Sequence, residues 1–259
     1  MAKRWALILG ASSGFGEAAS RRLARAGYPI FGVHLDRRQG MKHVEDLVAD
    51  IEKAGVAAKF FNINAADAEK REAALDEMKA ALGPGDDVGI LLHSLAFGTL
   101  RPFVGEGDTM TEAQMDMTLR VMAHSLVDWT QALLRRDMMG ENGRIYAMTS
   151  SGSTRVIPSY GAVSAAKSAL ESHIRQLAYE LAPRGIAANA IRAGVTDTPA
   201  LRKIPGNDRL IEGATAKNPA GRLTTPEDIA ECLVALSMPE TRWLTGNVLN
   251  VDGGEEITS

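Results

Sequence analysis

The segment Gly10-Ala11-Ser12-Ser13-Gly14-Phe15-Gly16 directly follows the apolar run Trp5–Leu9 and directly precedes a helix-like pattern. In a strand–loop–helix context, Gly10 lets the chain turn sharply, Gly14 lets the backbone approach a pyrophosphate at the helix N-terminus, and Gly16 allows close helix–sheet packing. We therefore predict a dinucleotide-binding loop. A glycine turn with only a structural role is the alternative.

Strand-like and helix-like segments alternate along the whole chain. Strands are expected at Trp5–Leu9, Ile30–Leu35, Ala57–Ile63, Val88–His93, Arg144–Thr149, Ile186–Ile191 and Asn247–Val251. Helices are expected at Gly16–Ala26, Met41–Ala54, Asp67–Leu82, Thr111–Met139, Ser159–Leu181 and Thr225–Leu236. Buried strands alternating with helices imply a parallel sheet covered on both faces, and right-handed crossovers make it doubly wound. We expect one α/β domain of Rossmann type over residues 1–259, with a seven-stranded parallel sheet.

Composition narrows the class of protein. Of the 259 residues, 45% are hydrophobic and 24% are charged, which is typical of a globular chain. The net charge of −3 gives no global field that would hold nucleic acid, and no apolar run approaches the length of a membrane span. The single cysteine, Cys232, suits a reducing cytoplasm, and the five histidines have no metal-ligand spacing. We expect a cytoplasmic protein with no metal ion and no nucleic-acid or membrane partner.

The spacing of the glycines, with three residues and then one between them, resembles the short-chain dehydrogenase/reductase family. The resemblance covers nearly the whole chain, including Asn64-Ala65 after the third strand and the C-terminal stretch Gly246–Gly254. It implies a nicotinamide dinucleotide cofactor, adenine contacts at Asn64-Ala65, and a homotetramer. The cofactor contacts that it implies are Gly10, Ser12, Ser13, Gly14, Phe15, Gly16, Asn64, Ala65, Ser94, Leu95, Lys167, Gly194, Val195 and Thr198.

The usual active site of this family is a serine, a tyrosine, and a lysine four residues after the tyrosine. Lys167 is present, but Val163 stands four residues before it, and the nearest tyrosine is Tyr160, seven residues before it. This longer spacing resembles the enoyl-acyl carrier protein reductases within the family. Seven residues are two helical turns, so Tyr160 and Lys167 would share one face. Ser150 stands where the family places its serine, although a plain loop serine is the alternative.

Other departures from the family pattern point the same way. The fourth strand ends in His93–Gly98 in place of Asn-Asn-Ala-Gly, and the sixth leads into Ala193-Gly194 in place of Pro-Gly. Both are similar to enoyl reductases. Met122 falls near the position of the catalytic asparagine, and His93 is interpreted as a strand-end residue rather than an acid or base. The segments Gly98–Pro102 and Asn218–Arg222 resemble a divergent, bacillus-type branch.

The chemistry gives a reason for the displaced tyrosine. In a carbonyl reductase, hydride adds to the carbonyl carbon and an alkoxide forms, so the enzyme needs an acid in contact with the carbonyl oxygen. An enoyl thioester takes hydride at its β-carbon, so enolate charge builds on the more distant thioester oxygen. Tyr160 would stabilise that oxygen through its hydroxyl, and Lys167 would hold the nicotinamide ribose. The substrate contacts that we expect are Ala96, Phe97, Leu100, Tyr160 and Leu201.

The second strand ends in His34-Leu35-Asp36-Arg37-Arg38, which bears on the choice of cofactor. Asp36 would bind a ribose diol and favour NADH, but it lies two places beyond the usual acidic position. Arg37 and Arg38 would bind a 2′-phosphate as charged forks. The pattern favours NADPH over NADH, with a solvated turn as the alternative.

Ligands of doubly wound sheets bind beyond the carboxyl ends of the strands. The longest loop at that edge without strand character predicts a substrate lid at about residues 193–218. Apolar and basic residues interleave in it, as in Leu201, Arg202, Lys203 and Arg209. This would suit an acyl chain inside and an acidic carrier protein outside. A solvated amphipathic helix is the alternative.

We therefore expect an enoyl-acyl carrier protein or enoyl-CoA reductase that transfers hydride from NAD(P)H to the β-carbon of a trans-2-enoyl thioester in fatty acid synthesis. A short-chain carbonyl reductase or alcohol dehydrogenase acting on a ketone or hydroxysteroid is the second hypothesis, and it requires Tyr160 to swing toward the carbonyl. A catalytically silent dinucleotide-sensing regulator is the third, and the pair of Tyr160 and Lys167 argues against it.

Overall fold

The computed structural model describes residues 2–258. Its strands are β1 (Arg4–Leu9), β2 (Ile30–His34), β3 (Ala58–Asn62), β4 (Asp87–His93), β5 (Arg144–Thr149), β6 (Ala187–Ala193) and β7 (Val248–Val251). All neighbours are parallel, in the order β3-β2-β1-β4-β5-β6-β7. The chain winds outward first on one side of β1 and then on the other, so the carboxyl ends of β1 and β4 form the topological switch point where such sheets bind ligands.

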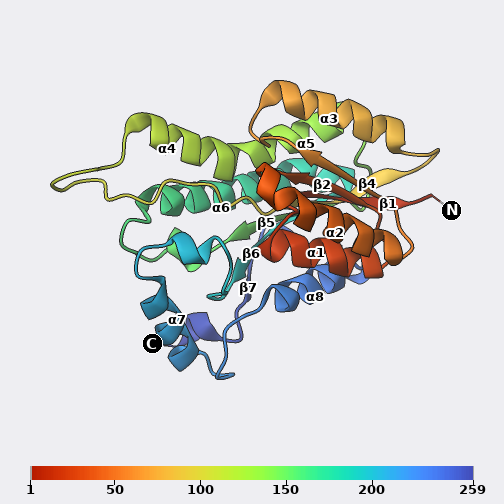
Figure 1. Ribbon diagram of the computed structural model, residues 1–259. Coiled ribbons are helices and arrows are strands. Elements are labelled where there is room, and N and C mark those ends of the chain that lie inside the picture. The colour runs from red at the N-terminus through yellow and green to blue at the C-terminus, as the bar shows by residue number, and fades with distance from the viewer. Residues whose placement is uncertain (1, 259) are drawn as a thin grey trace.

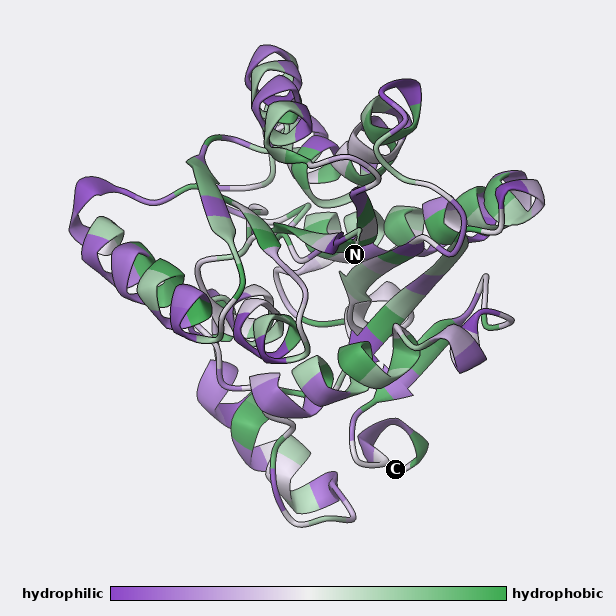
Figure 2. Ribbon diagram, turned by 90° about the vertical axis from the view of Figure 1, so that its right-hand side faces the viewer, coloured by the Kyte–Doolittle hydropathy of each residue, from purple (hydrophilic) through white to green (hydrophobic). Residues whose placement is uncertain are grey.

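The helices cover both faces of the sheet (Figure 1). They are α1 (Gly14–Arg25), α2 (Met41–Lys53), α3 (Ala68–Ala81), α4 (Glu112–Leu119), α5 (Ser125–Arg135), α6 (Gly161–Leu181), α7 (Asn207–Lys217) and α8 (Pro226–Leu236). One layer consists of α1, α2 and α8, and the other of α3, α4, α5 and α6. In Figure 2 many helices carry hydrophilic and hydrophobic residues in alternating bands, as expected of amphipathic outer-layer helices. The seven-stranded, doubly wound α/β fold predicted from the sequence is confirmed.

The side chains of β1 show how the two layers are held. Trp5, Leu7 and Leu9 point into the core shared with α3, α5 and α6, while Ala6 and Ile8 point into the core shared with α1, α2 and α8. Alternate residues of a strand face opposite sides, and here both sides are apolar and buried. The strand is therefore fixed from both faces, which gives the loop after Leu9 a rigid base.

The structure corrects the predicted helix at Thr111–Met139. It consists of α4, a π-helical turn at Arg120–His124 and α5, which ends at Arg135. The chain leaves the helix because Asp137 has φ +50, a left-handed conformation that interrupts helical hydrogen bonding. Met138 and Met139 are nevertheless buried. These two methionines are apolar because they pack in the core after the end of α5, and they do not continue the helix.

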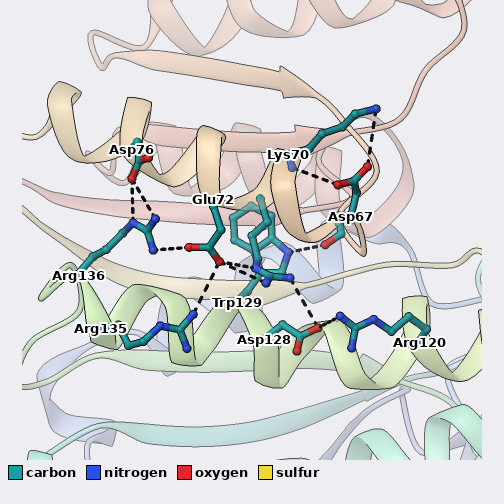
Figure 3. A network of polar contacts seen from close by, with 11 residues as sticks. Asp67, Lys70, Glu72, Asp76, Arg120, Asp128, Trp129, Arg135 and Arg136 are labelled. Carbon is teal, nitrogen blue, oxygen red and sulfur yellow. Dashed lines mark hydrogen bonds and ion pairs between the residues drawn. The ribbon is translucent and has the colours of Figure 1, made fainter.

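A polar network between α3 and α5 fixes the loop after β3 (Figure 3). The Trp129 indole donates a hydrogen bond of 2.8 Å to the carbonyl oxygen of Ala65. Nearby, Arg136 forms ion pairs with Glu72 at 2.6 Å and with Asp76 at 3.0 Å. The loop containing Asn64-Ala65 is thus attached to α5 through its backbone, while Asn64 itself is exposed.

Candidate active site

The glycine loop after β1 is built by close backbone approaches. Gly10 has φ +88, and a Cβ there would lie 2.3 Å from the carbonyl oxygen of Ser94. Gly16 is buried, and a Cβ there would lie 1.9 Å from the carbonyl oxygen of Gly10. Neither position has room for a side chain. At Gly14, by contrast, the nearest atom to an added Cβ is Thr198 Cγ2 at 3.5 Å, an ordinary contact, and the backbone borders an open space at the N-terminus of α1.

That open space is a cavity of about 580 Å³ at the carboxyl ends of β1, β4, β5 and β6. It brings together most residues predicted for cofactor, substrate and catalysis. These are Ser13, Gly14, Phe15, Ser94, Leu95, Ala96, Leu100, Ser150, Tyr160, Lys167, Gly194, Val195, Thr198 and Leu201. The backbone of Gly14 and a helix N-terminus at one end of the cavity fit a pyrophosphate.

The remaining predicted residues lie outside the cavity lining. Gly10 and Gly16 stand behind it as packing positions, and Ser12 lies between them on the loop. Asp36, Arg37 and Arg38 follow β2, and Asn64 and Ala65 follow β3, on the side of the glycine loop away from Tyr160. Phe97 is 57% exposed and does not line the cavity.

The charged residues of the loop after β2 differ in whether they have partners within the protein. The Asp36 carboxylate lies 2.9 Å from Nδ1 of the buried His34, and its backbone N–H donates to Oδ1 of Asn62 at 3.0 Å. Arg37 and Arg38 are exposed, and within residues 2–258 their side chains form no hydrogen bond or ion pair. Asp36 is thus engaged in its own loop, whereas the two guanidinium groups are free to contact a ligand.

The predicted helix begins at Ser159 and includes Tyr160, but α6 begins at Gly161, so Tyr160 stands immediately before it. Ser159 has φ +60, which delays the start of α6 to Gly161. The Tyr160 hydroxyl lies 3.5 Å from Oγ of Ser150, and burial raises the pKa of the tyrosine. At neutral pH the hydroxyl therefore keeps its proton and is a hydrogen-bond donor to the cavity.

Lys167 lies deeper in the same cavity. Its Nζ donates to the carbonyl oxygen of Met148 at 2.7 Å. Burial lowers the pKa of the ammonium to about 8, against the opposing charge of Glu171. Glu171 is itself held by the hydroxyl of Thr149 at 2.7 Å. The lysine therefore supplies a fixed positive charge at neutral pH.

The positions where the family usually has a tyrosine and an asparagine are apolar here. Val163 is 4% exposed and Met122 is 2% exposed, and they belong to one hydrophobic cluster. A Cβ on Gly98 would lie 2.7 Å from Cγ2 of Val163 and 2.9 Å from Sδ of Met122. The π-helical turn carries Met122 to this place, and such turns often occur at functional sites.

His93 ends β4 below the cavity and is fully buried. Its Nε2 lies 2.9 Å from Oγ of Ser125, and burial together with the charge of Lys167 lowers its pKa to about 3. The imidazole is therefore neutral at physiological pH. It fits the sequence interpretation of His93 as a strand-end residue and not an acid or base.

Several cavity residues carried no clear sequence signal. Arg155 and Lys217 add positive charge to the lining, and Glu255 adds a carboxylate. Lys203 and Arg209 of the predicted lid line the cavity as well. Their positions depend on contacts between the loop after β5, the end of α7 and the C-terminal segment, which no local motif specifies.

The expected basic surface of the lid is only partly free. Arg202 forms ion pairs with Asp197 at 2.6 Å and with Asp208 at 3.3 Å, so neighbouring carboxylates neutralise it. In the part of the chain that the structure describes, Lys203, Arg209 and Lys217 have no ion-pair partner. The free positive charge that the lid region adds to the cavity therefore comes from these three side chains.

Comparison with known proteins places this geometry in a class. A family model described as enoyl-(acyl carrier protein) reductase matches residues 10–256. The chain is 36% identical over 168 residues to the NADH-type enoyl-[acyl-carrier-protein] reductase of Aquifex aeolicus, a region that covers 65% of this chain but only 62% of that enzyme. It is 28% identical over 253 residues to the 3-oxoacyl-[acyl-carrier-protein] reductase of Escherichia coli, covering 96% of each.

The solved structure of the Aquifex aeolicus enoyl reductase has a TM-score of 0.86 and 26% identity, and the superposition covers 100% of this chain and 98% of that one. Fold, glycine loop and family match together define an oxidoreductase with a doubly wound sheet. The chain belongs to the short-chain dehydrogenase/reductase family, whose members use NAD(P)H, and matches the family model that bears the enoyl reductase description.

No group of three or more His, Cys, Asp or Glu side chains within residues 2–258 could hold a metal ion. No helix among these residues has the length and apolar character needed to cross a membrane.

The buried ammonium of Lys167 predicts a pH-dependent stability. Between its folded pKa of about 8 and its unfolded value of 10.5 the unfolded chain binds more protons, so stability rises with pH in this window. Below pH 8 burial of the charge costs on the order of 3 kcal/mol. Lys167→Met should therefore be more stable than the wild type at pH 7, and denaturant unfolding should find this advantage shrinking as the pH rises to 10.5.

Lys53→Met, at an exposed lysine that ends α2, is the matched control and should give no such pH-dependent difference. A constant difference between Lys167→Met and the wild type from pH 7 to 10.5 would contradict the assignment of a buried charge.

Proposed function

We propose that this protein is an enoyl-thioester reductase that reduces the double bond of a trans-2-enoyl thioester in fatty acid synthesis. The observation that carries the proposal is the convergence of Tyr160 and Lys167 on one cavity, while Val163 occupies the usual tyrosine position as a buried apolar residue. The enoyl reductase description of the matching family model supports it.

In the proposed reaction, the bound nicotinamide dinucleotide supplies a hydride. The backbone at Gly14 and the N-terminus of α1 would bind the pyrophosphate, and the Lys167 ammonium would bind the nicotinamide ribose hydroxyls. The Tyr160 hydroxyl donates a hydrogen bond to the thioester oxygen as enolate charge develops there. The α-carbon then takes up a proton from solvent water, so the product has gained one hydride and one proton.

The apolar wall supports an enoyl substrate over a ketone. Val163 and Met122 are apolar and provide no proton donor beside the hydride acceptor. A ketone oxygen at that place would therefore not be protonated. A β-carbon needs no such donor, because its charge moves to the thioester oxygen. Leu100 and Leu201 also line the cavity and suit an acyl chain.

We propose NADPH as the preferred cofactor, and residues 193–218 as the substrate lid. Free Arg37 and Arg38 support the first, because a 2′-phosphate needs cations that are not already paired. Free Lys203, Arg209 and Lys217 support an acidic partner at the lid, and we take acyl carrier protein as the form in which the substrate arrives. The proposal includes a cytoplasmic homotetramer, as the single cysteine and the family resemblance imply.

A carbonyl reductase is the second candidate, because the chain resembles a 3-oxoacyl-[acyl-carrier-protein] reductase along 96% of its length. The contact between Ser150 and Tyr160 also resembles a serine–tyrosine pair that binds a carbonyl oxygen. Assays of NAD(P)H oxidation with an enoyl thioester and with a panel of ketones separate the two candidates.

The cofactor proposal predicts that Arg37→Ala combined with Arg38→Ala weakens NADPH binding by about tenfold for each lost charged contact. NADH binding should change little, because NADH has no 2′-phosphate. Calorimetric titration with both dinucleotides measures the effect. A wild-type protein that already prefers NADH would show that Asp36 dominates instead.

The carrier proposal predicts that Lys203→Glu combined with Arg209→Glu raises KM for an enoyl-acyl carrier protein, most at low salt. The coenzyme A thioester should be much less affected. Arg184→Glu is the matched control, since this exposed arginine lies between α6 and the amino end of β6, whereas the cavity lies at the carboxyl ends of the strands. Equal effects on both substrates would remove the carrier-docking proposal.

The reaction itself is tested at Tyr160. Tyr160→Phe keeps the ring and deletes the hydroxyl, so kcat for an enoyl thioester should fall by about 10²–10³, the usual effect of losing one oxyanion donor. Dinucleotide affinity should barely change, whereas Lys167→Ala should weaken it together with turnover. Tyr179→Phe, at an exposed tyrosine on α6, is the control.

Full enoyl reduction by Tyr160→Phe, or a wild-type protein that reduces ketones and no enoyl thioester, would reject the enoyl reductase proposal in favour of the carbonyl candidate.

A further inference from the structure

A carboxylate from the C-terminal segment lies inside the cavity. Oε2 of Glu255 accepts a hydrogen bond of 3.0 Å from the backbone N–H of Val195, two residues after the end of β6. The absence of a side chain at Gly194 makes this approach possible, since a Cβ there would lie 2.9 Å from the same oxygen and 2.4 Å from Oγ1 of Thr224. The contact therefore fills a place formed by three separate segments.

The C-terminal segment is anchored on both sides of this contact. Arg155 donates to the carbonyl oxygen of Glu256 at 3.1 Å, and Asn218 donates to that of Asp252 at 2.8 Å. The hydroxyl of Thr258 donates to the carbonyl oxygen of Lys217 at 3.1 Å. With these anchors in place, the Glu255 side chain can leave Val195 by rotating its own bonds, without release of the whole segment.

The topology indicates which half of a dinucleotide reaches this place. Asp36 and Asn64 follow β2 and β3, on one side of the glycine loop, and they fit the adenosine half. Val195 follows β6, on the other side, in the same cavity as Tyr160 and Lys167. The nicotinamide half would therefore lie toward Val195, and its one hydrogen-bonding ring substituent is a carboxamide whose oxygen is an acceptor.

The Val195 N–H donates to the Glu255 carboxylate, and a carboxamide oxygen of a bound dinucleotide would compete for the same N–H. The Glu255 carboxylate is a weak competitor for this N–H, because its environment disfavours its charge. Burial raises the pKa of Glu255, the nearby acids Asp252 and Glu256 add to this, and only the Val195 N–H and the charge of Arg155 oppose it. Because burial of this carboxylate is costly, little free energy is lost when its side chain moves from Val195 into water.

We propose that Glu255 is an internal competitor for the nicotinamide half of the dinucleotide, and that its carboxylate leaves the Val195 N–H when the ligand is seated. The side chain thereby sets the affinity for the cofactor. The inference depends on dinucleotide binding and not on the identity of the reduced substrate, so it stands or falls separately from enoyl reduction.

The test is calorimetric titration of two matched ligand pairs, NADPH with 2′-phospho-ADP-ribose and NADH with ADP-ribose. Each pair differs only by the nicotinamide. Glu255→Ala should tighten dinucleotide binding by roughly tenfold, the equivalent of one hydrogen bond to a charged group no longer displaced. Binding of the nicotinamide-free ligands should be unchanged. Glu255→Gln should give a smaller gain, because a neutral amide oxygen still accepts from Val195 but more weakly.

Glu256→Gln is the control variant, since its carboxylate pairs with Arg155 and Arg192 and does not contact Val195. It should leave every affinity unchanged. Unaltered or weaker dinucleotide binding by Glu255→Ala overturns the proposal, as does an equal gain for the ligands that lack nicotinamide. A wild-type protein that binds neither dinucleotide would overturn both the cofactor assignment and the Glu255 proposal. A negative result with the Glu255 variants alone would overturn only the Glu255 proposal.

Discussion

Much of the active-site geometry depends on one buried charge, the ammonium of Lys167. A buried cation is tolerated only when partners are held around it, because its desolvation costs several kcal/mol. Met148 offers a carbonyl oxygen at 2.7 Å, and Glu171 offers the opposite charge one turn further along α6. Glu171 is in turn held by Thr149 and Arg192. The end of β5, the end of β6 and the middle of α6 are therefore fixed together before any ligand binds.

The sequence predicted those parts whose signal is local. Five of the six residues of β1 are buried, so its apolar run identifies it, and Gly10 and Gly16 of the next loop stand where no side chain fits. Helix α7 gave no such signal. Ala214 is its one buried residue, and Gly206 precedes it without a side chain to cap it. A helix with almost no buried face has only a weak apolar periodicity, so the sequence favours a loop with lid function at about residues 193–218 and leaves a solvated amphipathic helix as the alternative. The structure has helix α7 in this segment.

Charges near the site were predictable as residue types but not as free or paired groups. Arg202 and Lys203 are adjacent in the sequence, yet Arg202 is neutralised by two aspartates while Lys203 faces the cavity unpaired. Asp36 looked like a ribose ligand, but it lies against His34. Glu255 was missed altogether, because its partner Val195 is far away in the chain. Pairing depends on tertiary neighbours, which the order of residues does not reveal.

The apolar block at Val163, Met122 and Gly98 explains why the departures from the common family pattern occur together. Val163 and Met122 each lie so close to Gly98 that a single added carbon atom there would come within 3 Å of both. A tyrosine ring in place of Val163 would therefore collide with this wall unless Met122 and the loop at Gly98 also changed. A polar relay and this wall are alternative solutions to packing the same space. Because a chain has to adopt one or the other as a unit, the displaced tyrosine, the missing asparagine and the altered segment after β4 form one structural change.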